Sequence, residues 1–133
     1  MKAEWDILLS QWQDGTQSRE TALRLLFLSW YSCSEPTYLS GLDEVQPPKD
    51  FVDELFEFVG GQEADDIEVL FVVAVMAEVA AWCLGDEHHW ERVAGIFRSR
   101  LNGRVPALNI FAGRSTYGEY FEHHARGQSS GAT

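Results

Sequence analysis

A run of 18 mostly apolar residues, 67–84, constrains the fold more than any other feature of this chain. The run contains Glu68 and Glu78, and a charge near the centre of a membrane span costs about 2.5 to 3.5 kcal/mol on insertion scales. Its apolar residues surround the helix axis, as is typical of a helix buried inside a bundle. We therefore expect a central helix that ends at Gly85.

Other segments place apolar residues at helical spacing between capping and stop signals. They predict helices at residues 5–14, 18–34, 48–59, 90–101 and 116–126. Asp65 with Glu68, and Thr116 with Glu119, resemble capping boxes. The sequence predicts an all-α fold, a compact single-domain helical bundle of five to six helices around a buried central helix. Residues 1–126 form this domain, and residues 127–133 have the composition of a disordered tail.

Negative charge is concentrated in residues 35–68, which contain eleven acidic residues and one lysine, a net charge of −10 in a chain of −11. Such a one-sided field speeds association with a partner of opposite sign and repels like charges. It opposes binding to nucleic acid, whose phosphates are negative. We expect a basic protein partner.

The expected partner-binding residues follow from helix geometry. Within the predicted helix 48–59, four acids recur at spacings of three and four and form a stripe opposite the apolar face, without a following lysine or arginine to compensate them. A solvated face is the alternative interpretation. Flanking acids extend the stripe, and Tyr38 is the best candidate for an exposed aromatic anchor. The predicted site comprises Tyr38, Asp43, Glu44, Asp50, Asp53, Glu54, Glu57, Asp65 and Asp66.

The two cysteines, Cys33 and Cys83, lie among apolar neighbours. The N-terminus lacks the pattern of a signal peptide, so a cytoplasmic location is expected. Buried, reduced thiols are favoured over a disulfide or a reactive cysteine.

Candidate chemistry is sparse. Glu78 stands among apolar residues, so we expect it to be buried and paired with an arginine such as Arg24 or Arg114, with a general-acid role as the alternative. The His88–His89 and His123–His124 pairs cannot chelate one ion as helical neighbours, since adjacent side chains point about 100° apart. No nucleophile-elbow, zinc-protease or phosphate-loop motif occurs. We expect neither an enzyme nor a cofactor or metal.

The chain is acidic and helical, and it has two aromatic segments at residues 30–42 and 111–121. In these features it resembles the small immunity proteins of bacterial toxin systems. The resemblance implies that the chain neutralises a cognate toxin, here by covering a basic site with the acidic surface. The first alternative is an acidic helical adaptor for a basic host protein. The second, less favoured, is a small enzyme that uses Glu78 with a histidine under the Gly113 loop.

Overall fold

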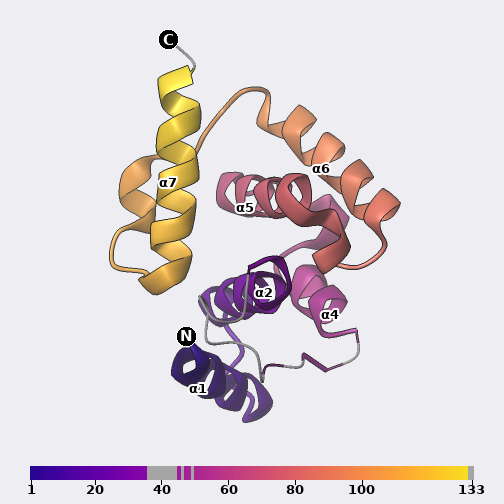
Figure 1. The fold of residues 1–133 in the computed structure, drawn as a ribbon, viewed down its shortest axis with the longest axis vertical. Helices are drawn as coiled ribbons and strands as arrows, with labels where there is room; N and C mark the ends of the chain where they lie inside the picture. The colour runs from indigo at the N-terminus through magenta and orange to yellow at the C-terminus, as the bar shows by residue number, and fades with distance from the viewer. Residues whose placement is uncertain (36–44, 46, 49, 132–133) are drawn as a thin grey trace.

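The apolar run forms helix α5, Ile67–Ala80, at the centre of the computed structural model, which describes residues 1–35, 45, 47–48 and 50–131. Eleven of the 14 residues of α5 are buried. Figure 1 shows α5 between α6 on one side and α2 on the other, with α7 across its end. The expectation of an all-α domain around a buried central helix is confirmed.

The surrounding α-helices are α1 (Lys2–Gln13), α2 (Arg19–Ser34), α4 (Phe51–Phe58), α6 (Glu87–Leu101) and α7 (Ser115–Gly131). Three short 3-10 helices join them: η1 (Gly61–Glu63), η2 (Ala81–Cys83) and η3 (Leu108–Phe111). Helix α6 packs along α5, α1 and α4 pack against α2, and η3 packs against α7. The described residues contain no strand, and η3 lies in residues 105–111, the one stretch whose sequence could be taken for a strand.

Three helices begin at a side chain that accepts a hydrogen bond from the backbone N–H three residues later. Ser18 caps α2, Asp66 caps α5 and Asp86 caps α6. Each cap satisfies a donor that the first turn leaves unpaired. The start of the central helix therefore lies at Asp66, one residue after the expected Asp65.

Several other boundaries differ from expectation. Helix α4 begins at Phe51, because Asp50 adopts a left-handed conformation (φ 61°), so Pro48 lies before the helix. Helix α7 begins at Ser115, so Thr116 is inside it, and it continues to Gly131, past the expected end near Arg126.

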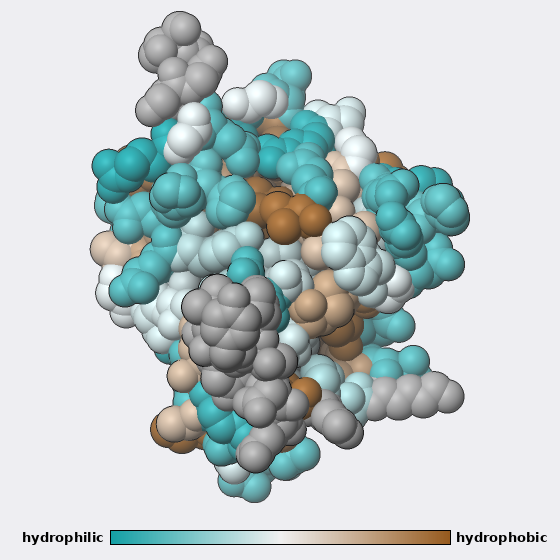
Figure 2. All heavy atoms as spheres, in the orientation of Figure 1, coloured by the Kyte–Doolittle hydropathy of each residue, from teal (hydrophilic) through white to brown (hydrophobic). Residues whose placement is uncertain are grey.

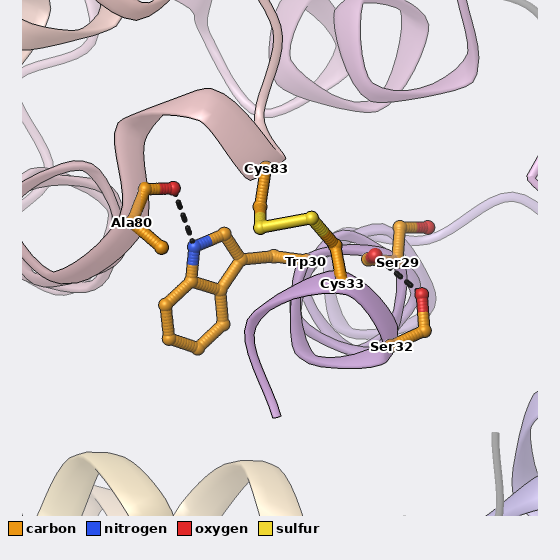
Figure 3. The surroundings of a disulfide bond; sticks show 6 residues. All are labelled: Ser29, Trp30, Ser32, Cys33, Ala80 and Cys83. Atoms are coloured by element: carbon orange, nitrogen blue, oxygen red, sulfur yellow. Dashed lines mark hydrogen bonds between the residues drawn. A yellow bond between two sulfur atoms is a disulfide. The ribbon is translucent and has the colours of Figure 1, made fainter. Parts of the chain in front are cut away.

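The central helix ends at Ala80, not at Gly85, and a side chain from α2 binds a carbonyl that its last turn leaves free. The buried indole N–H of Trp30 donates to the carbonyl of Ala80 over 3.1 Å, and the backbone of Ala80 leaves the helical region (φ −154°, ψ 75°). Figure 3 shows the indole directed at this carbonyl. The chain then continues through η2.

The expectation of reduced, buried cysteines is wrong. Cys33, in the last turn of α2, and Cys83, at the end of η2, form a disulfide with Cα atoms 5.5 Å apart (Figure 3). Both segments had been judged by their apolar neighbours in the sequence, which cannot show that the end of α2 meets the turn after α5. Cys33 is exposed and Cys83 is half-buried, so the bond lies near the surface.

None of the helices in the described part of the chain combines the length and the apolar character needed to cross a membrane. Figure 2 shows a surface on which hydrophilic residues predominate, with small apolar areas between them.

Candidate partner-binding surface

Helix α4 is sharply two-sided. Phe51, Leu55 and Phe56 are buried against the core, and Phe56 packs edge-on against Trp90 of α6 with ring centroids 4.9 Å apart. The acids of the predicted stripe, Asp50, Asp53, Glu54 and Glu57, are all exposed. The structure therefore brings these four predicted residues together on the solvent side of one helix, and we call them the α4 acidic face.

The four acids of this face differ in whether their carboxylates already have a partner within the protein. Glu54 accepts a hydrogen bond of 2.9 Å from the indole N–H of Trp12 in α1, a neutral partner that engages its carboxylate, although no lysine or arginine pairs with it among the described residues. Asp53 and Glu57 have no ion-pair partner among the described residues, and Asp50 makes no side-chain capping bond. The charge available to a partner is therefore concentrated on Asp50, Asp53 and Glu57.

Glu57 is held close to the chain that follows it. A Cβ atom at Gly61, where φ is +60°, would lie 2.8 Å from a carboxylate oxygen of Glu57. Glycine is thus favoured at position 61 by its left-handed backbone conformation, whereas the Glu57 carboxylate, at the end of a flexible side chain, can move away from an added Cβ atom.

The acids after α4 divide into two roles. Asp66 caps α5 and forms an ion pair of 2.6 Å with Arg19, so it is a structural residue and its place in the predicted site is not supported. Glu63 and Asp65 are exposed. The turn that carries them is fixed from α6, since Arg100 donates hydrogen bonds to the carbonyls of Gln62 and Ala64.

Three predicted residues, Tyr38, Asp43 and Glu44, lie outside the residues that the structure describes. The structure does supply an aromatic beside the acidic face that the sequence analysis had assigned to no site. Phe58, one turn after Glu54, is 45% exposed and contacts the ring of Trp12 edge-on at 5.0 Å between centroids. An exposed aromatic next to charged groups is typical of binding surfaces.

A groove of about 430 Å³ lies between α1 and α4, next to this face. Trp12 and Phe51 contribute aromatic walls, Asp50 and Glu54 contribute carboxylates, and Gln13 and Gln17 contribute amides. Carboxylates beside aromatic walls suit a cationic side chain, which needs both a counter-charge and a surface for its aliphatic stem.

A second group of charged residues, which the sequence analysis did not identify, joins four helices. Glu68 of α5 is buried, with 6% of its surface exposed, and accepts from Tyr117 over 2.6 Å and from Arg19 over 3.1 Å, while Arg114 lies 2.7 Å away. Arg114 also pairs with Glu20 of α2, and Glu20 with Arg24. Ser115 closes the chain of contacts by donating to Glu4 of α1. Because these polar groups pair with one another across α1, α2, α5 and α7, this cluster holds the bundle together.

The pKa values in the cluster follow from burial and pairing. Burial would lower the pKa of Arg114, but hydrogen bonds to Glu20 and Glu68 outweigh it and raise this pKa. Burial would raise the pKa of Glu20, yet its bonds to Arg114 and Arg24 lower it. Burial, with the nearby Glu68 charge, raises the pKa of Tyr117. Arg114, Glu20 and Tyr117 are therefore each stabilised in the form that they have at neutral pH.

Tyrosine ionisation is expected to limit stability at alkaline pH. Burial raises the pKa of Tyr120 to about 12, and it raises that of Tyr117 as well. In the unfolded chain these phenols ionise near pH 10. Their contribution to the free energy of unfolding is therefore fully present below pH 10 and is lost as the pH rises through their pKa values in the folded protein. Titration at 295 nm, with circular dichroism on the same samples, should show tyrosinate from these residues appearing together with helix loss. Their ionisation near pH 10 in a fully helical protein would contradict this, and Tyr120→Phe should move unfolding to higher pH.

Glu78 differs from its expected setting. It is exposed and paired with Arg98 of α6 through two contacts of 2.8 Å, whereas the proposed partners Arg24 and Arg114 bind Glu20. The expected arginine pairing is present, but the buried position is wrong because the last turn of α5 is open to solvent at residues 78 and 79. The buried glutamate of this helix is Glu68.

The histidine pairs are not assembled into a cluster. Within the described residues, no group of three or more histidine, cysteine, aspartate or glutamate side chains is placed to hold a metal ion. His124 packs on Tyr120 with ring centroids 4.7 Å apart, and burial together with His123 lowers its pKa. This histidine is therefore a packing residue that is neutral at pH 7.

Comparison with protein-family models, with curated proteins and with solved structures gave no match for this chain. The function must be inferred from its own residues.

Proposed function

We propose that this protein binds a basic protein partner through the α4 acidic face and, as an immunity protein, neutralises a toxin by covering its basic site. The observation that carries the proposal is the exposure of Asp50, Asp53 and Glu57 on one helix, whose carboxylates make no ion pair with any described residue. Like charges at these spacings destabilise a helix slightly, so a partner that neutralises them recovers that free energy.

The surroundings of the face support a protein as the ligand. Phe58 provides exposed aromatic area, and the groove between α1 and α4 offers carboxylates and aromatic walls to a lysine or arginine of the partner. A central apolar anchor surrounded by charges is the usual arrangement of an interface hot spot. An acidic adaptor for a host protein would use the same face, and the identity of the captured partner separates it from an immunity protein.

The disulfide bears on where this binding takes place. Disulfides persist in oxidising compartments and are rare in the cytosol. The Cys33–Cys83 bond therefore favours a partner that is met in an oxidising compartment, in place of the expected cytoplasmic location.

The test is to remove two free carboxylates by Asp53→Asn and Glu57→Gln and to measure affinity and association rate for the protein captured by the wild type. Association should slow by about tenfold, because the charges steer encounter, and raising the salt concentration should reproduce the loss. Stability should hold or rise by a few tenths of a kcal/mol. Glu54 is left intact because its bond to Trp12 would confuse the result.

A matched control removes the same charge elsewhere. Glu119→Gln with Glu122→Gln acts on α7, which Figure 1 places away from α4, and should leave binding unchanged. Equal effects in the two double variants would mean that net charge alone matters. Unchanged affinity without salt dependence would show that the face is only solvated. Protection of cells by the wild type, but not by the α4 variant, against the captured protein would establish immunity.

A further inference from the structure

Trp82 is the one tryptophan of five that faces solvent. It is 60% exposed, whereas Trp5, Trp12, Trp30 and Trp90 are at most 5% exposed. Exposing so large an apolar side chain forgoes a sizeable part of the stabilisation that its burial would give. An exposed tryptophan is therefore a candidate for contact with another molecule.

Trp82 borders a groove of about 390 Å³ between α5, η2 and α6. Three buried alanines, Ala77, Ala81 and Ala94, give the groove a smooth apolar floor. Glutamates 78, 87 and 91 line the same groove. We call this the Trp82 groove, and it shares no lining residue with the groove beside α4.

The charges of the groove are only partly compensated. Glu78 is paired with Arg98. Glu91 faces His88 at 3.9 Å, an ion pair only when that histidine is protonated, and Glu87 has no ion-pair partner among the described residues. Glu87 and Glu91 therefore place carboxylates without an arginine or lysine partner, among the described residues, beside an exposed indole.

The backbone on both sides of Trp82 is fixed. Before it, the carbonyl of Ala80 accepts from the indole of Trp30, and after it, Cys83 is joined to Cys33 (Figure 3). The indole is thus presented on a short segment that is anchored at each end, which lowers the cost of ordering it when a ligand binds.

We propose that the Trp82 groove binds an arginine-bearing segment of a basic protein. The guanidinium stacks on the indole of Trp82 and donates to Glu87 and Glu91, while the aliphatic stem lies on the alanine floor. Arginine fits better than lysine because its planar head stacks on an aromatic ring and forms paired hydrogen bonds with carboxylates. The inference uses residues separate from the α4 acidic face and stands independently of the proposed function.

The exposure of Trp82 allows a selective measurement. Collisional quenching of tryptophan fluorescence reaches exposed rings, so acrylamide reports mainly on Trp82, and Trp82→Phe should remove most of the quenchable signal. The probes are a blocked pentapeptide with one central arginine among alanines and the same peptide with citrulline, an uncharged analogue of arginine. The arginine peptide should protect Trp82 from quenching by acrylamide. The citrulline peptide should give the same protection only at about tenfold higher concentration.

Variants locate the effect. Glu87→Gln with Glu91→Gln should weaken protection by the arginine peptide about tenfold, and Glu57→Gln on α4 should leave it unchanged. Without any peptide, caesium should quench Trp82 more strongly than iodide, and this preference should vanish in the Glu87/Glu91 variant. Equal protection by both peptides, stronger protection by a lysine peptide, or no protection at millimolar concentration would overturn the proposal. Because Glu57→Gln is one of the two substitutions that test the α4 acidic face, loss of binding at one surface can be told apart from loss at the other.

Discussion

Replacing Cys33 and Cys83 with serine is expected to lower the free energy of unfolding by about 4 kcal/mol. The bond joins residues 50 apart in the sequence, and closing a loop of that length removes a large part of the conformational freedom of the unfolded chain. The native packing should survive, since Cys33 is exposed and Trp30 still binds the carbonyl of Ala80. Urea unfolding of the variant and the wild type, with and without reductant, gives the difference.

The single variants provide the control. Either Cys33→Ser or Cys83→Ser breaks the same bond, so each should cost nearly as much as the double variant, and the second substitution should add little. Reductant should destabilise the wild type and leave the double variant unaffected. Two titratable thiols in the folded protein as isolated, or additive single effects, would show that the bond is not what stabilises the fold.

Glu68→Gln should destabilise the protein by about 3 kcal/mol, because it leaves the positive charge of partly buried Arg114 without its nearest α5 partner. Glu68 and Arg114 have side chains 7% and 16% exposed, so water replaces little of the lost interaction. The amide keeps the shape of the side chain and can still accept from Tyr117. Thermal and urea unfolding measure the loss.

Helix α5 supplies the matched control in Glu78→Gln. Glu78 also pairs with an arginine, but its side chain is 44% exposed, and exposed ion pairs contribute less than about 1 kcal/mol. The two substitutions are chemically identical, but Glu68 is buried with three partners, whereas Glu78 is exposed with one. Equal losses of stability would mean that the cluster around Glu68 is not a buried network. A separate outcome, loss of partner binding in a folded Glu78→Gln variant, would mean that Glu78 belongs to the partner-binding surface.

The features that the sequence predicted correctly are those that depend on residues close to one another in the chain. The apolar faces of α1, α4 and α6 and the bounds of α2 near residues 18–34 follow from spacing and side-chain chemistry within one or two turns. The α4 acidic face belongs to the same class, since helical spacing places Asp53 and Glu57 together, and Asp50 lies at the N-cap immediately before the helix. The capping-box spacing from Asp65 to Glu68 pointed to Asp65 as the cap, whereas the adjacent carboxylate of Asp66 occupies that position.

The predictions that were wrong concern residues whose setting depends on contacts between distant segments. Glu68 looked like part of a helix cap, and no local pattern shows that Arg19 and Arg114, 49 residues before it and 46 after it, converge there. Glu78 looked buried because its neighbours are apolar, although one turn of α5 is open to water. The pairing of Cys33 with Cys83 likewise requires the packing of α2 against the end of α5. An amphipathic pattern identifies the buried face of a helix but not its partner.

The disulfide also changes what happens when the backbone is cut. Residues 33–83 form a covalent ring that contains α4, η1 and α5. One protease cleavage anywhere inside the ring opens it but leaves the two fragments joined through sulfur, whereas one cleavage outside it severs the chain. The α4 acidic face lies within the ring, so it stays attached to the core after a single nick, and a nicked molecule would separate into two pieces on a gel only after reduction.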